Sequence, residues 1–153
     1  MGDQMTKCNY CGGETVLTSG GLLYPNSLHL YDNLYYHCKS CDAWVGQHPV
    51  TGKPLGTLAN KELRAMRGMA HKAFDPFWEE NRDRAQAYSW LARQLKIPAT
   101  QCHIGMFDIE TCQKVIDICK NARQYKREAE EKARKRNEKL ARRAEKRKLK
   151  AKE

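Results

Sequence analysis

The chain has 153 residues and a formal net charge of +10, a length that allows one domain, or one small domain with an appendage. It contains no apolar run of membrane length, and its polar start, MGDQMTKC, is unlike a signal peptide. Seven cysteines are an odd number, which suits a reducing compartment better than a secreted disulfide scaffold. We therefore expect a cytoplasmic protein without a membrane partner.

The positive charge is concentrated at one end of the chain. Residues 1–119 contain 12 Lys/Arg and 12 Asp/Glu, so their formal charges cancel. Residues 120–153 contain 16 Lys/Arg and 6 Glu, and 16 − 6 gives the whole excess of +10. A neutral body with a basic tail predicts an acidic partner such as nucleic acid. We expect a monomer and no small-molecule substrate.

The first motif is a pair of C-x-x-C sequences, Cys8/Cys11 and Cys38/Cys41, with 26 residues between them. Two thiolates that bracket a tight turn point at one centre about 2.3 Å away, and two such turns supply the corners of a tetrahedron. A thioredoxin-like redox site would have a single pair. The spacing predicts one structural zinc ion, with iron or a pair of disulfides as alternatives.

The residues around the cysteines predict a zinc ribbon over residues 1–50. Aromatic and β-branched residues flank the second pair, YYH before it and AWV after it, which is typical of two strands of a hairpin. Gly12 and Gly13 follow the first pair, where a backbone that wraps a metal often requires a positive φ. His48, just after the ribbon, is a candidate hydrogen-bond donor to a zinc-bound thiolate.

Residues 51–119 are predicted to form a helical body packed on the ribbon, giving an α+β fold. Thr57 is a candidate N-cap for a first helix, and Asp75 for a second that begins at Pro76. One face of the first helix is expected to carry Leu63, Met66, Ala70 and Phe74.

The next helix is predicted from apolar residues at i, i+3, i+4 and i+7, namely Tyr88, Leu91, Ala92 and Leu95. Pro98 ends it, and the segment CHIGMFD predicts a turn or an extended piece. Asp108 then caps a last helix that begins at Ile109.

The apolar residues of the body predict its core. Trp44, Trp78 and Trp90 are expected to be buried, because a domain of this size needs large side chains to close a core. The helix AYSWLARQL is expected to be joined to the helix after Asp108 by packing among Trp90, Leu91, Phe107 and Ile116. Cys102, Cys112 and Cys119 are expected to be small buried side chains. A second metal site of Cys102, His103 and Cys112 is the alternative.

The tail, residues 120–153, contains neither Gly nor Pro and predicts a helix from Ile109 to about Lys150, or a partly disordered segment. Four pairs at i, i+4 support the helix: Glu128–Lys132, Glu130–Arg134, Glu131–Lys135 and Glu138–Arg142. No a/d heptad lasts three repeats, which argues against a coiled coil. The candidate phosphate-binding residues are Arg134, Lys135, Arg136, Arg142, Arg143, Lys146, Arg147 and Lys148. A solvated helix with no specific partner is the alternative.

Several segments resemble one family. They are CNYCGG, YHCKSCDAWVGQH, KPLGTLANKELR, AHKAFDPFWE, AYSWLARQLKIP and CHIGMFDIETCQKVI, and they run from about Cys8 to Cys119. Together they resemble a family of short zinc-finger-containing proteins, encoded mostly by bacteriophages and prophages. The resemblance implies that Cys8, Cys11, Cys38 and Cys41 bind the zinc, and that the setting is a host cytoplasm. It implies no reaction, and the basic tail lies outside it.

Two classes of function follow from these observations. The first is a non-catalytic zinc-binding module that binds nucleic acid through its tail, docks on a host protein, or does both. The second is an enzyme such as a metal-dependent nuclease, using some of His37, His48, His71, His103 and Asp75. A four-cysteine zinc site keeps no open position for water, and the histidines show no catalytic spacing such as H-E-x-x-H. His71 lies one helical turn from Arg67 and is equally expected as a capping or core residue. The sequence therefore favours the binding module.

Overall fold

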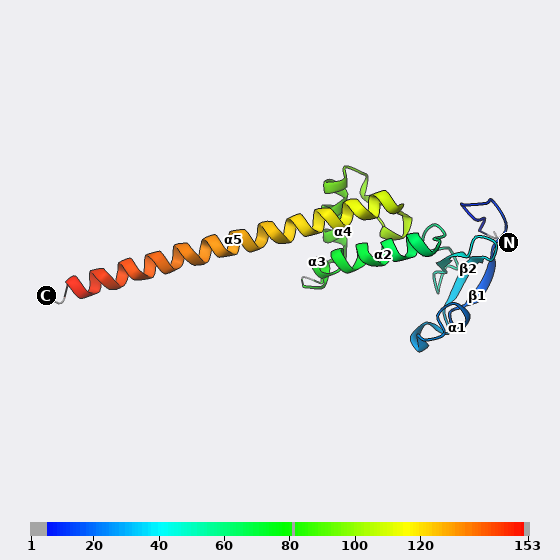
Figure 1. The fold of residues 1–153 in the computed structure, drawn as a ribbon, viewed down its shortest axis with the longest axis horizontal. Helices are drawn as coiled ribbons and strands as arrows, with labels where there is room; N and C mark the ends of the chain where they lie inside the picture. The colour runs from blue at the N-terminus through cyan, green and yellow to red at the C-terminus, as the bar shows by residue number, and fades with distance from the viewer. Residues whose placement is uncertain (1–5, 81, 152–153) are drawn as a thin grey trace. The chain divides into compact units, whose positions relative to one another are not determined.

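The structure is a computed structural model that describes residues 6–80 and 82–151 (Figure 1). It contains a small antiparallel sheet and several helices, so the predicted α+β fold is confirmed. The chain divides into two compact units between Ile116 and Asp117, and each unit is described separately below. The predicted boundaries after residues 50 and 119 stay predictions.

The sheet has three strands in the order β1 (Val16–Ser19), β2 (Leu34–Cys38) and β3 (Ala43–Gly46). The β2–β3 hairpin holds the second cysteine pair at its turn, as expected from the flanking aromatic residues. The first strand, β1, was not predicted; it pairs antiparallel with β2. The segment that follows the sheet is attached to it by isolated β-bridges, in which Trp44 pairs with Ala59 and Gln47 pairs with Pro54.

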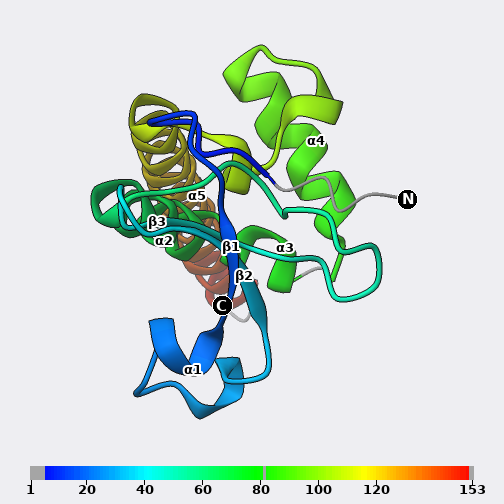
Figure 2. The same cartoon turned by 90° about the vertical axis from the view of Figure 1, so that its right-hand side faces the viewer.

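A short excursion separates β1 from β2 and contains α1 (Gly20–Leu23) and the 3-10 turn η1 (Leu28–Leu30). Figure 2 shows α1 at one end of the sheet, next to the strand that leads into it. A Cβ atom at Gly20 would lie 1.8 Å from the carbonyl oxygen of Leu30, so the excursion can close only over a glycine.

Helix α2 spans Lys61–Phe74 and buries Leu63, Ala70 and Phe74 as predicted, whereas Met66 is half-buried. The prediction that Thr57 caps this helix is wrong. Asn60 is the N-cap, because its side chain accepts a hydrogen bond from the backbone N–H of Leu63 at 3.0 Å. Thr57 instead accepts two hydrogen bonds from the guanidinium of Arg67.

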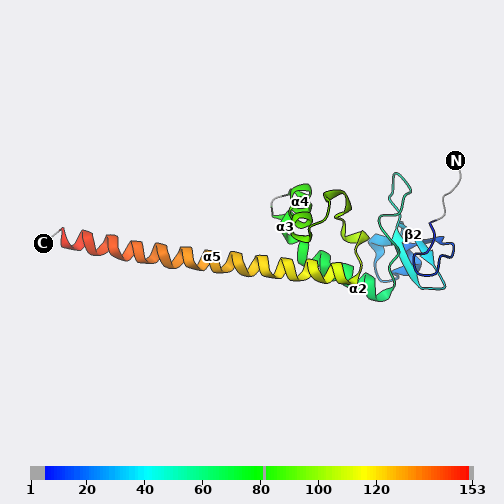
Figure 3. The same ribbon diagram turned by 90° about the horizontal axis from the view of Figure 1, so that it is seen from above.

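The chain continues through α3 (Pro76–Glu79) into α4 (Arg84–Leu95), which pack against each other (Figure 3). Pro76 is the first residue of α3, as expected, but Asp75 makes no capping hydrogen bond. Its backbone is itself helical, and its carboxylate accepts from the indole N–H of Trp78. Asp83 caps α4, and Lys96 ends it in the left-handed conformation, two residues before Pro98.

Two 3-10 turns, η2 (Ala99–Gln101) and η3 (Ile104–Met106), join α4 to the last helix. Here Gly105 passes so close to Gly56 that a Cβ atom at Gly56 would lie 2.0 Å from the Gly105 carbonyl oxygen. Arg67 fixes this crossing, because it donates to the carbonyl oxygens of Thr57 and Phe107. Its burial lowers the pKa of its guanidinium, yet its donors have partners on both segments.

The core of the first unit contains fewer large aromatic side chains than the sequence predicts. Trp44, Trp78 and Trp90 are half-buried, so their expected place in the core is wrong. Trp90 stacks on Phe77 with the ring centroids 5.2 Å apart. Leu91 and Phe107 are buried as expected, but Ile116 is half-buried. The largest fully buried side chains of the helical part of this unit are Phe74, Leu91, Cys102, Ile104, Cys112 and Val115.

Helix α5 spans Ile109–Lys150, close to the predicted bounds. Asp108 caps it as predicted, since its carboxylate accepts from the backbone N–H of Thr111 at 2.8 Å. In the second unit, Glu131 pairs with Lys135 as predicted, at 2.8 Å, while Glu138 pairs with Arg134 at 3.0 Å and not with its expected partner. No helix among residues 6–80 and 82–151 is long and apolar enough to cross a membrane.

Candidate metal centre

The structure brings the sulfur atoms of Cys8, Cys11, Cys38 and Cys41 together, all within 4.8 Å of one another. The Sγ atoms of Cys11 and Cys38 are 3.7 Å apart. Four sulfurs at the corners of a tetrahedron with metal–sulfur bonds of about 2.3 Å lie about 3.8 Å apart. The donor set and its spacing therefore fit one tetrahedral ion of the zinc type.

The first pair of cysteines lies in a tight turn whose backbone points toward the sulfurs. The N–H of Tyr10 donates to Cys8 Sγ and the N–H of Gly13 donates to Cys11 Sγ, both at 3.4 Å. Gly12 adopts φ +72°, and its N–H donates to the Cys8 carbonyl oxygen at 2.8 Å. These hydrogen bonds hold the turn closed around its two sulfur atoms.

The second pair repeats this turn with a residue that sequence analysis overlooked. Asp42 follows Cys41 as Gly12 follows Cys11, and it too is left-handed, with φ 48°. Aspartate tolerates this conformation better than most residues, because its short polar side chain can bond locally. Aligning CNYCG with CKSCD would have revealed the correspondence.

Both turns are attached to the start of helix α2. In the first, the side-chain amide of Asn9 donates to the Leu58 carbonyl oxygen at 3.3 Å, and the Tyr10 hydroxyl accepts from the N–H of Asn60 at 3.2 Å. In the second, Arg64 donates to the Asp42 carbonyl oxygen at 2.9 Å. The metal centre therefore holds not only the hairpin but also the N-terminus of α2.

The crowding of the four sulfur atoms favours a cation at their centre. Cys8 and Cys38 are buried, Cys41 is half-buried and Cys11 is exposed. The hydrogen bond with Cys11, with a smaller contribution from burial, raises the pKa of Cys41 to about 12. Thiolates held this close together repel one another, and a divalent ion at their centre would stabilise all of them.

Each histidine named in the enzyme hypothesis makes its own set of contacts in the structure. The prediction that His48 donates to a thiolate is wrong: its Nδ1 accepts from the N–H groups of Val50 and Thr51, at 3.2 and 3.1 Å, within its own turn. His71 Nδ1 lies 3.3 Å from the Asp75 carboxylate, and the His103 ring contacts that of Tyr88.

His37 belongs to the sheet. Its Nδ1 lies 3.4 Å from the Thr18 hydroxyl, its Nε2 lies 3.5 Å from the Asp42 carboxylate, and its ring meets that of Trp44 edge-on. Its contacts are therefore with both neighbouring strands, β1 and β3, and with the second cysteine turn.

The remaining cysteines are separate from the metal centre. Cys102, Cys112 and Cys119 are buried, as expected for small apolar side chains, and burial raises the pKa of each thiol, to about 11 for Cys119. Among the residues that the structure describes, the four-cysteine cluster is the one group of three or more candidate ligands whose donor atoms meet. Cys102, His103 and Cys112 do not form a second one.

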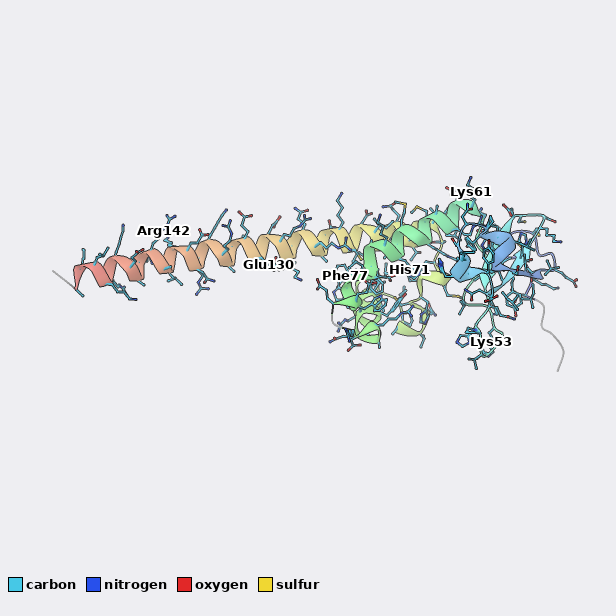
Figure 4. The ribbon with its side chains drawn as sticks, turned by 90° about the horizontal axis from the view of Figure 1, so that it is seen from below. Lys53, Lys61, His71, Phe77, Glu130 and Arg142 are labelled. Carbon is cyan, nitrogen blue, oxygen red and sulfur yellow. The ribbon has the colours of Figure 1, made fainter. Side chains whose placement is uncertain are left out.

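The eight candidate phosphate-binding residues all lie on α5 with exposed side chains. Arg134 and Lys135 are engaged in the ion pairs with Glu138 and Glu131. The other six project from the distal part of the helix, and Figure 4 shows Arg142 extending away from it.

A comparison with protein families matches residues 4–122 to a model described as a zinc-finger-containing domain. Neither the search among curated proteins nor the search among solved structures returned a match. The family and the four-cysteine cluster together support one structural Zn²⁺ ion. Thiolates from two turns would hold it on all four sides, so its contribution is to folding.

Proposed function

Because the chain belongs to the family of zinc-finger-containing domains, we propose that it is a non-catalytic zinc-binding module whose basic tail binds nucleic acid. The observation that carries the proposal is the distribution of charge. Residues 1–119 are formally neutral and residues 120–153 carry the whole excess of +10. Every side chain from residue 123 to residue 151 is exposed, so these cations face solvent.

The zinc ion has a structural role in this proposal. A site closed by four cysteines leaves no position for a water or a substrate, which supports a non-catalytic function. The contacts from both cysteine turns to the start of α2 give the ion a clear task, because they tie the ribbon to the helical body.

Nucleic-acid binding by the tail would be electrostatic. Lys and Arg that neutralise phosphates release condensed counterions, so affinity falls steeply as salt is added. This term is independent of sequence, and a protein that makes six to ten phosphate contacts loses roughly a thousandfold or more in affinity between 50 and 200 mM salt.

The direct test compares the full chain with one that ends at Cys119, using fluorescence anisotropy on short duplexes and single strands. The shortened chain should keep its zinc and its thermal unfolding transition, which serve as controls, and should lose the binding. Equal binding by both chains would move the recognition surface to the ribbon, and no binding by the full chain at low salt would refute the proposal.

A second candidate, docking on a host protein, is favoured by one observation. The excursion between β1 and β2 exposes Leu22 and Leu28, at 77% and 79%. Exposed apolar side chains mark protein interaction sites when they form a patch, and both leucines belong to the same short excursion. The natural chain should capture a host protein from nuclease-treated extract. The double variant Leu22→Ser, Leu28→Ser should not capture it, although its zinc content should be unchanged. Capture that survives the double change would argue against this surface.

The proposed setting is the cytoplasm of a bacterial host, following the resemblance to phage-encoded proteins. The metal centre supports a reducing compartment, because zinc binds thiolates and not disulfides. All seven cysteines are unpaired in the structure.

A further inference from the structure

The cations of the tail are not spread evenly around α5. With 100° between successive residues of an α-helix, nine of those between residues 132 and 150 fall within an arc of about 140°. We call this set the basic stripe. Its members are Lys132, Lys135, Arg136, Lys139, Arg142, Arg143, Lys146, Arg147 and Lys150.

Acidic and small residues occupy the other side of the same segment. Glu138 and Glu145, the acidic residues between 132 and 150, fall outside the arc. Glu138 is directed to Arg134, which also lies off the stripe, at 3.0 Å. The face opposite the stripe carries Ala133, Asn137, Ala141 and Ala144 together with the two glutamates and two cations, Arg134 and Lys148, so its formal charges cancel. A helix that needs charge only for solubility has no reason to segregate it in this way.

The dimensions of the stripe fit one kind of nucleic acid. It extends over about 27 Å at 1.5 Å per residue, on a helix whose diameter with side chains is about 10–12 Å. The major groove of B-form DNA is about 12 Å wide and admits an α-helix. Cations on the two margins of the arc, such as Arg142 and Arg147, would then face the phosphates of opposite strands.

Other nucleic acids fit less well. The major groove of double-stranded RNA is deep and too narrow for side chains to enter. Proteins that bind single strands stack the bases on aromatic side chains, but Tyr125 is the one aromatic residue in residues 120–153 and precedes the stripe. We infer that the basic stripe binds duplex DNA along its major groove through backbone phosphates. This inference rests on the proposed function and specifies its partner.

Two full-length variants with equal charge loss test the stripe. The first removes four stripe cations by Lys139→Gln, Arg142→Gln, Arg143→Gln and Lys146→Gln. The matched control removes four tail cations that precede the stripe by Lys120→Gln, Arg123→Gln, Lys126→Gln and Arg127→Gln. Far-UV circular dichroism should show equal helicity in both variants, so that any difference in binding reflects position and not folding.

Binding is measured by fluorescence anisotropy with a duplex DNA of about 20 base pairs in a salt series. The stripe variant should lose at least about tenfold in affinity, and its slope of log K against log salt should fall by about 3 to 4, at about 0.9 per phosphate. The control should stay within about threefold of the natural chain. Duplex RNA and single-stranded DNA of equal length should bind at least about tenfold more weakly than duplex DNA.

The outcomes separate this inference from the function on which it rests. Equal losses in the two variants would show that net charge, and not the stripe, sets the affinity. Duplex RNA or single strands that bind as tightly as duplex DNA would refute the assignment of partner while leaving nucleic-acid binding intact. If the natural chain binds none of the three at low salt, the proposed function itself fails.

Discussion

The guanidinium of Arg64 lies over the Trp44 ring, 3.3 Å from its centroid, and thereby joins helix α2 to strand β3. The same group donates to the carbonyl oxygens of Asp42 and Ala59, at 2.9 and 2.7 Å. Burial lowers the pKa of this guanidinium, but the ring and the two carbonyls compensate for lost hydration. One side chain therefore connects the second cysteine turn, the sheet and the helical body.

Replacing Arg64 should loosen this junction. We expect Arg64→Ala to reduce the free energy of unfolding by about 1–3 kcal/mol, through loss of the cation–π contact and two hydrogen bonds. The stability of Arg64→Lys should lie between those of the natural chain and Arg64→Ala, because lysine retains the charge but not the planar donor group. Urea unfolding measures both. Lys72→Ala, at an exposed position of the same helix, is the control, and an equal effect of Arg64→Ala and Lys72→Ala would contradict the role given to Arg64.

Replacing a zinc ligand should have a larger and different effect. Cys38→Ser should abolish zinc binding and unfold the ribbon, because structural zinc contributes its binding free energy to folding. Metal analysis of the purified protein should give one zinc per natural chain. Cys112→Ser, at a buried cysteine outside the cluster, should retain it. Zinc retained by the Cys38 variant, or absent from the natural chain, would contradict the site.

The burial of Leu91 in the helical core predicts the effect of shortening its side chain. Leu91 is fully buried on α4, so Leu91→Ala should cost about 2–5 kcal/mol as a cavity-forming change. Met69→Ala, at a side chain that is 54% exposed on α2, should cost little. Thermal and urea unfolding of the two variants provide the comparison, and similar losses would show that α4 is not packed as described.

The cap of α5 predicts a pH dependence. Hydrogen bonds from Thr111 hold the pKa of Asp108 below its usual value, so the folded protein binds this proton more weakly than the unfolded chain does. The stabilisation is fully present above the unfolded pKa of about 3.9 and is lost as the pH falls through the folded pKa.

Asp108→Ala should therefore cost about 0.5–2 kcal/mol near neutral pH, and the difference from the natural chain should shrink below about pH 4. Unfolding of both chains at the same pH controls for acid release of zinc. A difference that stays constant from pH 7 to pH 3 would assign the effect to something other than the carboxylate.

Much of this architecture is local and was therefore visible in the sequence. Neighbours within a few residues determine the C-x-x-C spacing inside each cysteine pair. The same holds for the Asp108 cap and for the bounds of α5. The errors arose where distant segments decide. Thr57 was not the cap of α2 because Arg67 engages it, while Tyr10, 50 residues away, contacts the true cap, Asn60.

The same holds for the core and the sheet. The excursion from Gly20 to Leu30 has no apolar periodicity, so nothing in it predicted α1. The strand before it was missed although its sequence, TVLT, contains the β-branched residues that indicate a strand. Trp90 was expected to be buried because of its size, but it stacks on Phe77 and remains half-buried. Val115 fills the core position expected of its neighbour Ile116, a shift of one residue that helical periodicity alone does not resolve.

The most direct test of a structural zinc and a nucleic-acid-binding tail is one salt series on duplex DNA, measured with zinc-loaded protein and with protein stripped by a chelator under reducing conditions. Far-UV circular dichroism and metal analysis monitor the loss of the ribbon. We predict that the stripped protein retains its affinity within about threefold and the same dependence on salt, because residues 120–153 carry the whole net charge. Loss of binding together with the zinc would contradict the account and assign recognition to the ribbon.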